Sequence, residues 1–143
     1  MTNYQTAVID EIKTRLKTIT DIGLVGEYPE NQPGTNYPVA LVFDGDEDFE
    51  FFSGDKIKSI WQVSIFTSQK VAINRLEKAN DFQVDIITKV LDGNDLDGTV
   101  SKLTLLSVEK GEYSKDLDLL DVGYSDTLIN RMINFEVEVC NAY

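Results

Sequence analysis

The hydrophobic period of this chain changes twice between Ile57 and Val108, and this change limits the possible folds more than any other feature. Apolar side chains alternate from Ile57 to Thr67, which is the period-two pattern of a β-strand. They then recur every three or four positions up to Leu91, as on one face of an α-helix. Alternation returns from Thr99 to Val108. The middle of the chain therefore predicts a strand, a long helix and a second strand, with the helix packed on a sheet.

The same alternation assigns side chains to faces. One face of the first strand is expected to carry Ile57, Trp61, Val63 and Ile65, and the other face Ile60 and Phe66. One face of the second strand is expected to carry Val100, Thr104, Leu106 and Val108, and the other face Leu103 and Leu105. The helix between them is predicted over residues 69–91, with a hydroxyl of Thr67 or Ser68 as its N-cap and Asp92-Gly93-Asn94 as its stop.

A second helix is predicted at the start of the chain. Apolar residues keep helical spacing up to a stop near Gly23, and they are Tyr4, Val8, Ile12, Leu16 and Ile19. Thr2 and Gln5 fit a capping box. All three prolines then fall within residues 26–38, so this stretch is predicted to be a loop. A short apolar strand over residues 38–43 is expected to end at Asp44-Gly45-Asp46.

The last part of the chain predicts a long connection and a final strand. Residues 109–127 show no regular period, and a connection of that length is uncommon within a compact domain. Residues 128–140 alternate again. Ile133, Phe135, Val137 and Val139 are expected to face the core, and Asn134, Glu136 and Glu138 to face water. Residues 1–143 are thus predicted to form a single α+β domain, with about four main strands in an antiparallel or mixed sheet covered by the N-terminal helix and the long central helix.

The composition lacks the residues that most catalytic sites use. Histidine is absent and Cys140 is the single cysteine, which removes Ser-His and Cys-His pairs and the usual zinc sites. Cys140 lies in an apolar strand, where a buried thiol is expected. We therefore predict no enzymatic activity, no cofactor and no metal. The sequence has no run of about 18 apolar residues and no signal-like start. We therefore expect neither membrane insertion nor secretion, and we expect the chain to be cytosolic.

Two acidic stretches resemble the start of a calcium loop but depart from its pattern. Asp44, Asp46 and Asp48 alternate, yet Phe49 occupies the sixth position, where the loop requires glycine. The stretch that begins at Asp92 has Asp97 at that position. Both are therefore predicted to be solvated turns.

The net charge of −12 indicates how the chain would behave near nucleic acid. The carboxylates gather in two stretches: Asp44, Asp46, Glu47, Asp48, Glu50 and Asp55 in one, and Asp116, Asp118, Asp121 and Asp126 in the other. An anionic surface repels phosphate over about 8 Å in physiological salt. Specific binding of DNA is therefore not expected, and solubility is the simplest role of this charge. The first acidic stretch is predicted to form a hairpin that contains Phe49, Phe51 and Phe52. These three side chains either fold onto the sheet or form a contact surface for another chain.

The order of these features resembles a family of viral structural proteins. The features are the short N-terminal helix, the proline-rich loop of residues 28–38, the Trp-Gln-Val-Ser-Ile-Phe strand of residues 61–66, the long helix, and the closing Arg-Met-Ile-Asn-Phe-Glu-Val-Glu-Val of residues 131–139. Together they look like the tail terminator or tail completion proteins of long-tailed bacteriophages. Head-tail joining (neck) proteins and minor capsid proteins have a similar size and layout and remain alternatives.

This resemblance implies a structural role in the virion. Such a protein forms a ring, expected to be a homo-hexamer, at the head-proximal end of the tail tube, where it stops tube growth and docks to the head. Its partners would be copies of itself, the major tail tube protein and the head-completion or connector proteins, after assembly in the cytoplasm of a bacterial host. DNA would pass through an acidic lumen without specific binding. We assign the lumen lining to Asp116, Asp118, Asp121 and Asp126, and the protein contacts to Phe49, Phe51 and Phe52. The alternative outside phages is a regulatory α+β domain that binds a small ligand.

Overall fold

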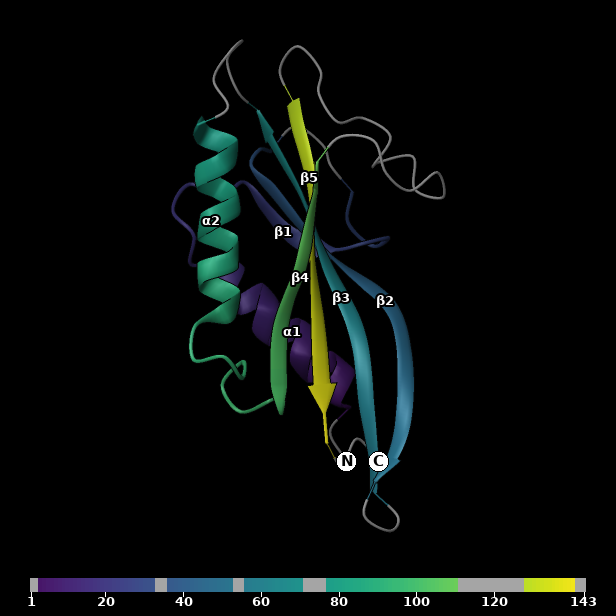
Figure 1. Cartoon of the computed structure of the whole chain (residues 1–143). Coiled ribbons are helices and arrows are strands. Elements are labelled where there is room, and N and C mark those ends of the chain that lie inside the picture. The colour runs from purple at the N-terminus through teal and green to yellow at the C-terminus, as the bar shows by residue number, and fades with distance from the viewer. Residues whose placement is uncertain (1–2, 33–35, 53–55, 71–76, 111–127, 141–143) are drawn as a thin grey trace.

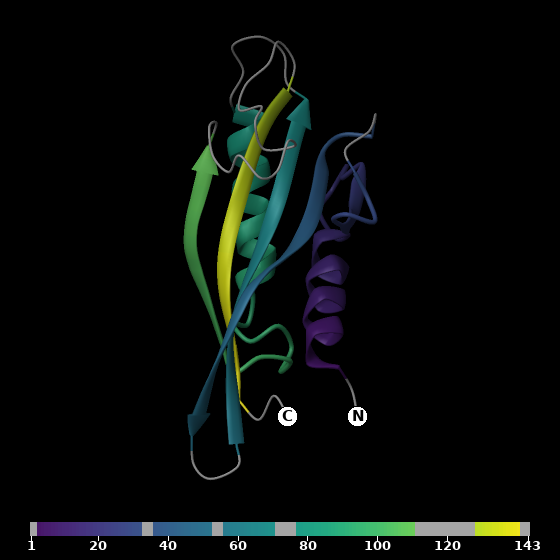
Figure 2. The same ribbon diagram turned by 90° about the vertical axis from the view of Figure 1, so that its right-hand side faces the viewer.

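Two helices cover one face of a five-stranded mixed sheet in the part of the chain that the structure describes (Figures 1 and 2). The computed structural model describes residues 3–32, 36–52, 56–70, 77–110 and 128–140. The elements are α1 (Tyr4–Leu16), β1 (Leu24–Glu27), β2 (Val39–Phe52), β3 (Lys56–Lys70), α2 (Glu77–Leu91), β4 (Lys102–Lys110) and β5 (Leu128–Val139). The α+β class with an N-terminal helix and a central helix is therefore confirmed. The predicted number of strands was one too low.

The additional strand is β1, which is short and lies at one edge of the sheet. The sheet order is β1-β2-β3-β5-β4. β1 runs parallel to β2, with Leu24–Glu27 beside Val39–Val42, and the other three pairings are antiparallel. Four residues are too few to show alternation. β1 also overlaps the beginning of residues 26–38, which were predicted to be a loop because they contain all three prolines.

The predicted end of the second strand was wrong, because β2 continues through Asp44-Gly45-Asp46. Its register with β3 moves from Asp44 opposite Val63 to Glu47 opposite Trp61, so β2 has one extra residue at this point. Such a β-bulge bends the strand without ending it. A Cβ atom on Gly45 would lie 2.6 Å from the carbonyl oxygen of Gln62, so only glycine fits there.

Both predicted helix starts were also wrong. Asn3 caps α1, with its Oδ1 accepting from the backbone N–H groups of Gln5 (2.9 Å) and Thr6 (3.3 Å). Thr67 and Ser68 belong to β3, where they pair with β5. The described part of α2 begins only at Glu77. The backbone hydrogen bonds offered by the long β5 outweigh the capping tendency of two hydroxyl side chains.

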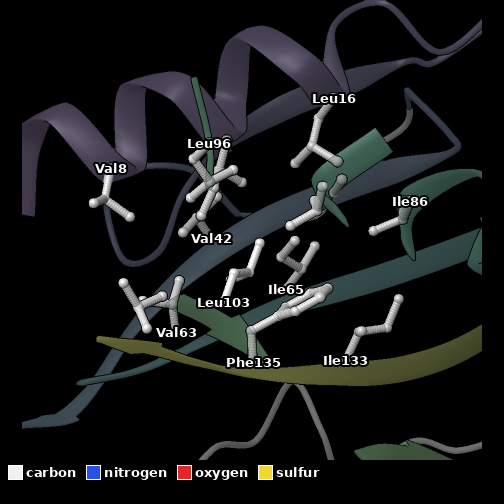
Figure 3. Close-up of a cluster of buried hydrophobic side chains, with 14 of the residues drawn as sticks. Val8, Leu16, Val42, Val63, Ile65, Ile86, Leu96, Leu103, Ile133 and Phe135 are labelled. Atoms are coloured by element: carbon white, nitrogen blue, oxygen red, sulfur yellow. The ribbon is translucent and has the colours of Figure 1, made fainter. Parts of the chain in front are cut away.

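The main core lies between the helices and the sheet (Figure 3). Val8, Ile12 and Leu16 of α1 and the inner face of α2 pack against β2, β3, β4 and β5 there. A smaller cluster covers the other face of the sheet and consists of Val39, Leu41, Phe43, Phe66 and Met132. Tyr28 stacks on Phe43 with their ring centroids 4.5 Å apart. The prediction that the Ile57–Thr67 strand carries apolar groups on both faces is confirmed.

The predicted faces of β4 and β5 were only partly correct. Leu103 and Leu105 of β4 share a face as predicted, because they pair with Val137 and Phe135, and Leu103 is buried in the core. The register shifts between Leu105 and Ser107, so Val108 lies on this face as well and not with Thr104, while Leu106 is 48% exposed. In β5, Ile133, Phe135, Val137 and Val139 are buried as predicted. Asn134, expected in water, is buried as well.

Hydrogen bonds account for the burial of Asn134, since its amide bridges β3 and β4. Ser64 donates to its Oδ1 (2.5 Å), and its Nδ2 donates to Ser107 (3.1 Å). Cys140 is half-buried rather than fully buried. Within the described ranges, the structure contains no helix with the length and apolarity that crossing a membrane requires.

Candidate functional site

The end of the β2–β3 hairpin projects beyond the rest of the sheet (Figure 2). The pairing of β3 with β5 begins at Ser59 opposite Val139. The β2 residues Glu50, Phe51 and Phe52 therefore pair with β3 below the described end of β5. A two-stranded extension of this kind is supported on few sides, so its orientation depends on how its base is fixed.

Glu47 fixes the base of the hairpin to helix α1. Because of the bulge, Glu47 lies opposite Trp61, on the face that the helices cover. Its carboxylate accepts hydrogen bonds from the hydroxyls of Tyr4 and Ser59, and from Nε2 of Gln5 at 2.6 Å. Three donors from two elements therefore meet on one side chain.

The indole of Trp61 adds a second connection next to Glu47. Its Nε1 donates to Asp44 (2.7 Å), and its ring meets the ring of Tyr4 edge to face, with centroids 6.5 Å apart. Trp61 itself is fully buried. The two carboxylates at the bulge are thus structural acceptors. Glu47 links the hairpin to α1, and Asp44 links β2 to the indole of β3 that contacts Tyr4.

The structure places two of the three predicted aromatic contact residues at the surface of the hairpin. Phe49 is 47% exposed and Phe51 is 79% exposed. They pair with Ser59 and Ile57, which share a face with Trp61 by the alternation of β3. Phe52 is the last residue of β2. The hairpin was predicted correctly, and a contact through these residues stays a prediction.

The four aspartates assigned to a DNA channel, Asp116, Asp118, Asp121 and Asp126, lie outside the described residues. Their role stays a prediction.

Besides Glu47, four described acidic residues of β2 are exposed along the strand. They are Asp44, Asp46, Asp48 and Glu50. Lys58 of β3 lies 3.3 Å from Glu50 and 3.8 Å from Glu138. The hydrogen bond to Glu50 and then the charge of Glu138 raise the pKa of Lys58 above its usual value of 10.5.

The opposite edge of the sheet carries a feature that the sequence did not predict. Leu105 and Leu106 are exposed on β4 (36% and 48%), and exposed lysines, Lys102 and Lys110, stand at the two ends of the strand. Simple alternation cannot place two adjacent leucines on one surface. Leu106 is the extra residue of the bulge between Leu105 and Ser107, where the phase of the strand changes. The pair of adjacent leucines is the sign in the sequence that could have indicated this exposed apolar edge.

A hollow of about 560 Å³ lies between α2, the segment that follows α1, the residues just before β2 and the end of β3. Five charged side chains contribute to its lining: Asp21, Lys70, Lys78, Asp81 and Asp85. It differs from the closed apolar cavity that a small-ligand domain would use. No cluster of three or more metal-ligating side chains occurs among the described residues.

Comparisons with known proteins do not add to these observations. No family model matches the chain, and no curated protein matches it. A proposal for its function therefore depends on the hairpin, the two sheet edges and the resemblance in element order.

Proposed function

We propose that this chain is a tail terminator of a long-tailed bacteriophage. In this role, copies of the chain form a ring, with six as the expected number, at the head-proximal end of the tail tube. The ring stops tube growth and presents a docking surface to the head. The protein would be assembled in the cytoplasm of a bacterial host and retained in the neck of the virion.

The observation that carries this proposal is the exposed aromatic pair on an anchored projection. Burial of a phenylalanine side chain stabilises a protein by about 1.5–3 kcal/mol, and Phe51 forgoes most of that at 79% exposure. Large aromatic residues that are exposed in a monomer are typical of protein contacts. Because Glu47 ties the base of the hairpin to α1, the pair is presented at a defined position.

The net charge supports passage of DNA through such a ring. Six copies of a chain with a net charge of −12 carry −72. A pore lined with carboxylates repels phosphate, so DNA would slide through it without adhering. We retain Asp116, Asp118, Asp121 and Asp126 as the proposed lining.

Polymerisation of tail tubes in the presence of the purified protein tests this function. The tubes are assembled from the major tail protein encoded in the same genome, and their lengths are measured by negative-stain electron microscopy. We expect shorter tubes with additional density at one end. Tubes of normal length with bare ends would contradict the proposal, and binding to the head connector in place of the tube would identify a neck protein.

A further inference from the structure

We propose that neighbouring copies join through two dissimilar edges of their sheets, so that Asp48 of one copy lies beside Lys102 of the next. The first edge, called the acidic edge, consists of residues 43–48 of β2. The second, called the β4 edge, consists of residues 102–106. This inference specifies how the proposed ring would be built, and it therefore rests on the proposed function.

Both edges lack a neighbouring strand in the described part of the chain. β4 is the last strand of the sheet. β1 pairs with β2 only from Val39 to Val42, so the outer side of β2 is uncovered from residue 43 onward. Backbone N–H and C=O groups at such edges can accept a strand from another chain.

The pairing register places Asp48 and Lys102 at the same height on the two edges. Lys102 pairs with Glu138, Glu138 pairs with Ile60, and Ile60 pairs with Asp48. Residues that lie directly opposite one another point to the same face of a sheet. Asp48 and Lys102 therefore share the face that the helices leave uncovered.

The two side chains cannot meet within one molecule. Three strand spacings of about 4.8 Å separate β2 from β4 across the sheet. When two copies stand side by side in the same orientation, however, the β4 edge of one adjoins the acidic edge of the next. β2 runs antiparallel to β4, because three antiparallel pairings separate them, and antiparallel pairing is the more stable kind.

Charge favours this pairing over the symmetric ones. Asp44, Asp46 and Asp48 are exposed along the acidic edge, and Lys102 is exposed on the β4 edge. Neither Asp48 nor Lys102 has an ion-pair partner within 4 Å among the described residues. Two acidic edges would oppose carboxylates, and two full β4 strands would bring Lys102 towards Lys110. Like charges opposite one another destabilise a strand pair.

The dissimilar edges have a consequence for assembly. A contact between two different surfaces leaves one of each unused at the ends, so it repeats from copy to copy and forms a ring when the rotation closes. Each contact is small, because about five residues pair on each strand and an exposed ion pair contributes little. Pairs of subunits are therefore expected to be transient, and covalent trapping is the suitable measurement.

Cysteine cross-linking tests the proposed contact directly. The variant Asp48→Cys/Lys102→Cys is prepared with Cys140→Ser, so that no native thiol remains, and is oxidised at high protein concentration. We expect a ladder of disulfide-linked species extending beyond the dimer on a non-reducing gel. Each single-cysteine variant can form dimers at most. Circular dichroism of the reduced variants verifies that all of them are folded.

Lys110 provides the matched control. It pairs with Arg131, Arg131 with Thr67, and Thr67 with Ala40, and β1 covers β2 at Ala40. Asp48→Cys/Lys110→Cys is therefore expected to yield at least fivefold less material above the dimer. Equal ladders from the two double variants, or dimers alone from both, would overturn the proposed contact.

A charge exchange provides an independent measurement. Lys102→Glu should weaken the association seen by chemical cross-linking of the Cys140→Ser protein, and Asp48→Lys in the same chain should restore it. Failure of that rescue would also overturn the contact. Tube capping does not require the contact to be at these residues. Capping without a disulfide ladder would therefore reject the edge contact alone, and a ladder without capping would reject only the tail-terminator role.

Discussion

At the scale of single residues, Glu47 connects the hairpin to the body of the protein. Its carboxylate accepts from Tyr4, Gln5 and Ser59. Glu47→Ala leaves these donors without their acceptor, and Ser59 is fully buried. We expect the free energy of unfolding to fall by about 1–3 kcal/mol, the usual cost of an unsatisfied buried polar group. Urea denaturation measures this change.

Asp48→Ala is the control for Glu47→Ala. Asp48 is the next residue of the same strand, points to the other face and is exposed. Its removal should change the free energy of unfolding by no more than about 0.5 kcal/mol. Similar losses for the two variants would mean that the three hydrogen bonds do not anchor the hairpin.

Single residues also show where sequence reasoning stops. The spacing of Val8, Ile12 and Leu16 correctly predicted the buried face of α1, because a helix imposes its own period. Leu96 belongs to none of the periodic patterns in the sequence. In the structure it is fully buried and has a φ of 49°, a left-handed conformation that is costly for a leucine. Packing between the helices and the sheet sets this conformation, and local sequence contains no sign of it.

At the scale of elements, α1 is connected to its neighbours by two cations. Arg15 donates from Nη1 to the carbonyl oxygens of Lys89 (3.1 Å) and Asp92 (2.5 Å) at the end of α2, where the helix leaves carbonyl groups without partners. Glu11 orients the guanidinium of Arg15, since its Oε1 lies 3.0 Å from Nε of Arg15. Lys13 lies 2.5 Å from Glu27 of β1. The first helix thus fixes the positions of α2 and of the edge strand.

The ion pair of Lys13 predicts a dependence of stability on pH. The hydrogen bond to Glu27 raises the pKa of Lys13 above 10.5, so the folded state binds this proton more tightly than the unfolded state does. The contribution of this ion pair to the free energy of unfolding is complete below pH 10.5. It is lost as the pH rises through the raised pKa of Lys13 in the folded state. The side chains of Lys13 and Glu27 are partly exposed, at 24% and 30%. We therefore expect their ion pair to contribute about 0.5 kcal/mol to the free energy of unfolding.

Lys13→Met tests this dependence. Urea denaturation at pH 8 should show the variant to be less stable than the unchanged protein, and the difference should shrink above pH 11. A difference that stays constant over this range would assign the loss to packing of the lysine chain and not to its charge.

The elements themselves were predicted to different degrees. A short apolar run identified the beginning of β2, alternation identified β3, β4 and β5, and helical spacing identified both helices. The failures within β2 and β4 lie at their bulges, where one added residue reverses every later side chain. The bulge in β2 depends on contact of Gly45 with Gln62, and the one in β4 on pairing with β5. Contacts between strands determine both, so single-strand patterns cannot reveal them. For the candidate site, the sequence predicted the aromatic hairpin but neither its anchor at Glu47 nor the exposed leucines of β4.

At the scale of the whole molecule, the two faces and two edges of the sheet have different surroundings. The helices cover one face, and a smaller apolar cluster lies on the other. The acidic edge and the β4 edge are uncovered by any described strand, and the hairpin extends beyond both (Figure 2). Lateral contacts through the edges and an axial contact through the hairpin would use separate surfaces. In the proposed ring, one copy would therefore contact two neighbours and the tube at the same time.

This separation predicts that the axial contact can be removed alone. Phe51→Ser should leave the free energy of unfolding nearly unchanged, because the side chain is 79% exposed. If Phe51 is a central contact with the tube, its loss should cost about 2 kcal/mol of binding, or roughly thirtyfold in the concentration needed to stop tube growth. Tube length against protein concentration measures this shift.

Val84→Ser supplies the comparison on a different surface. Val84 is also apolar and exposed, at 58%, but it lies on α2, and serine and valine have similar helix propensities. We expect no change in capping for this variant. The cross-linked ladder through Asp48→Cys/Lys102→Cys should persist in Phe51→Ser, since the edges do not include Phe51. Equal capping by Phe51→Ser and Val84→Ser would mean that the tip of the hairpin is not the surface that meets the tube.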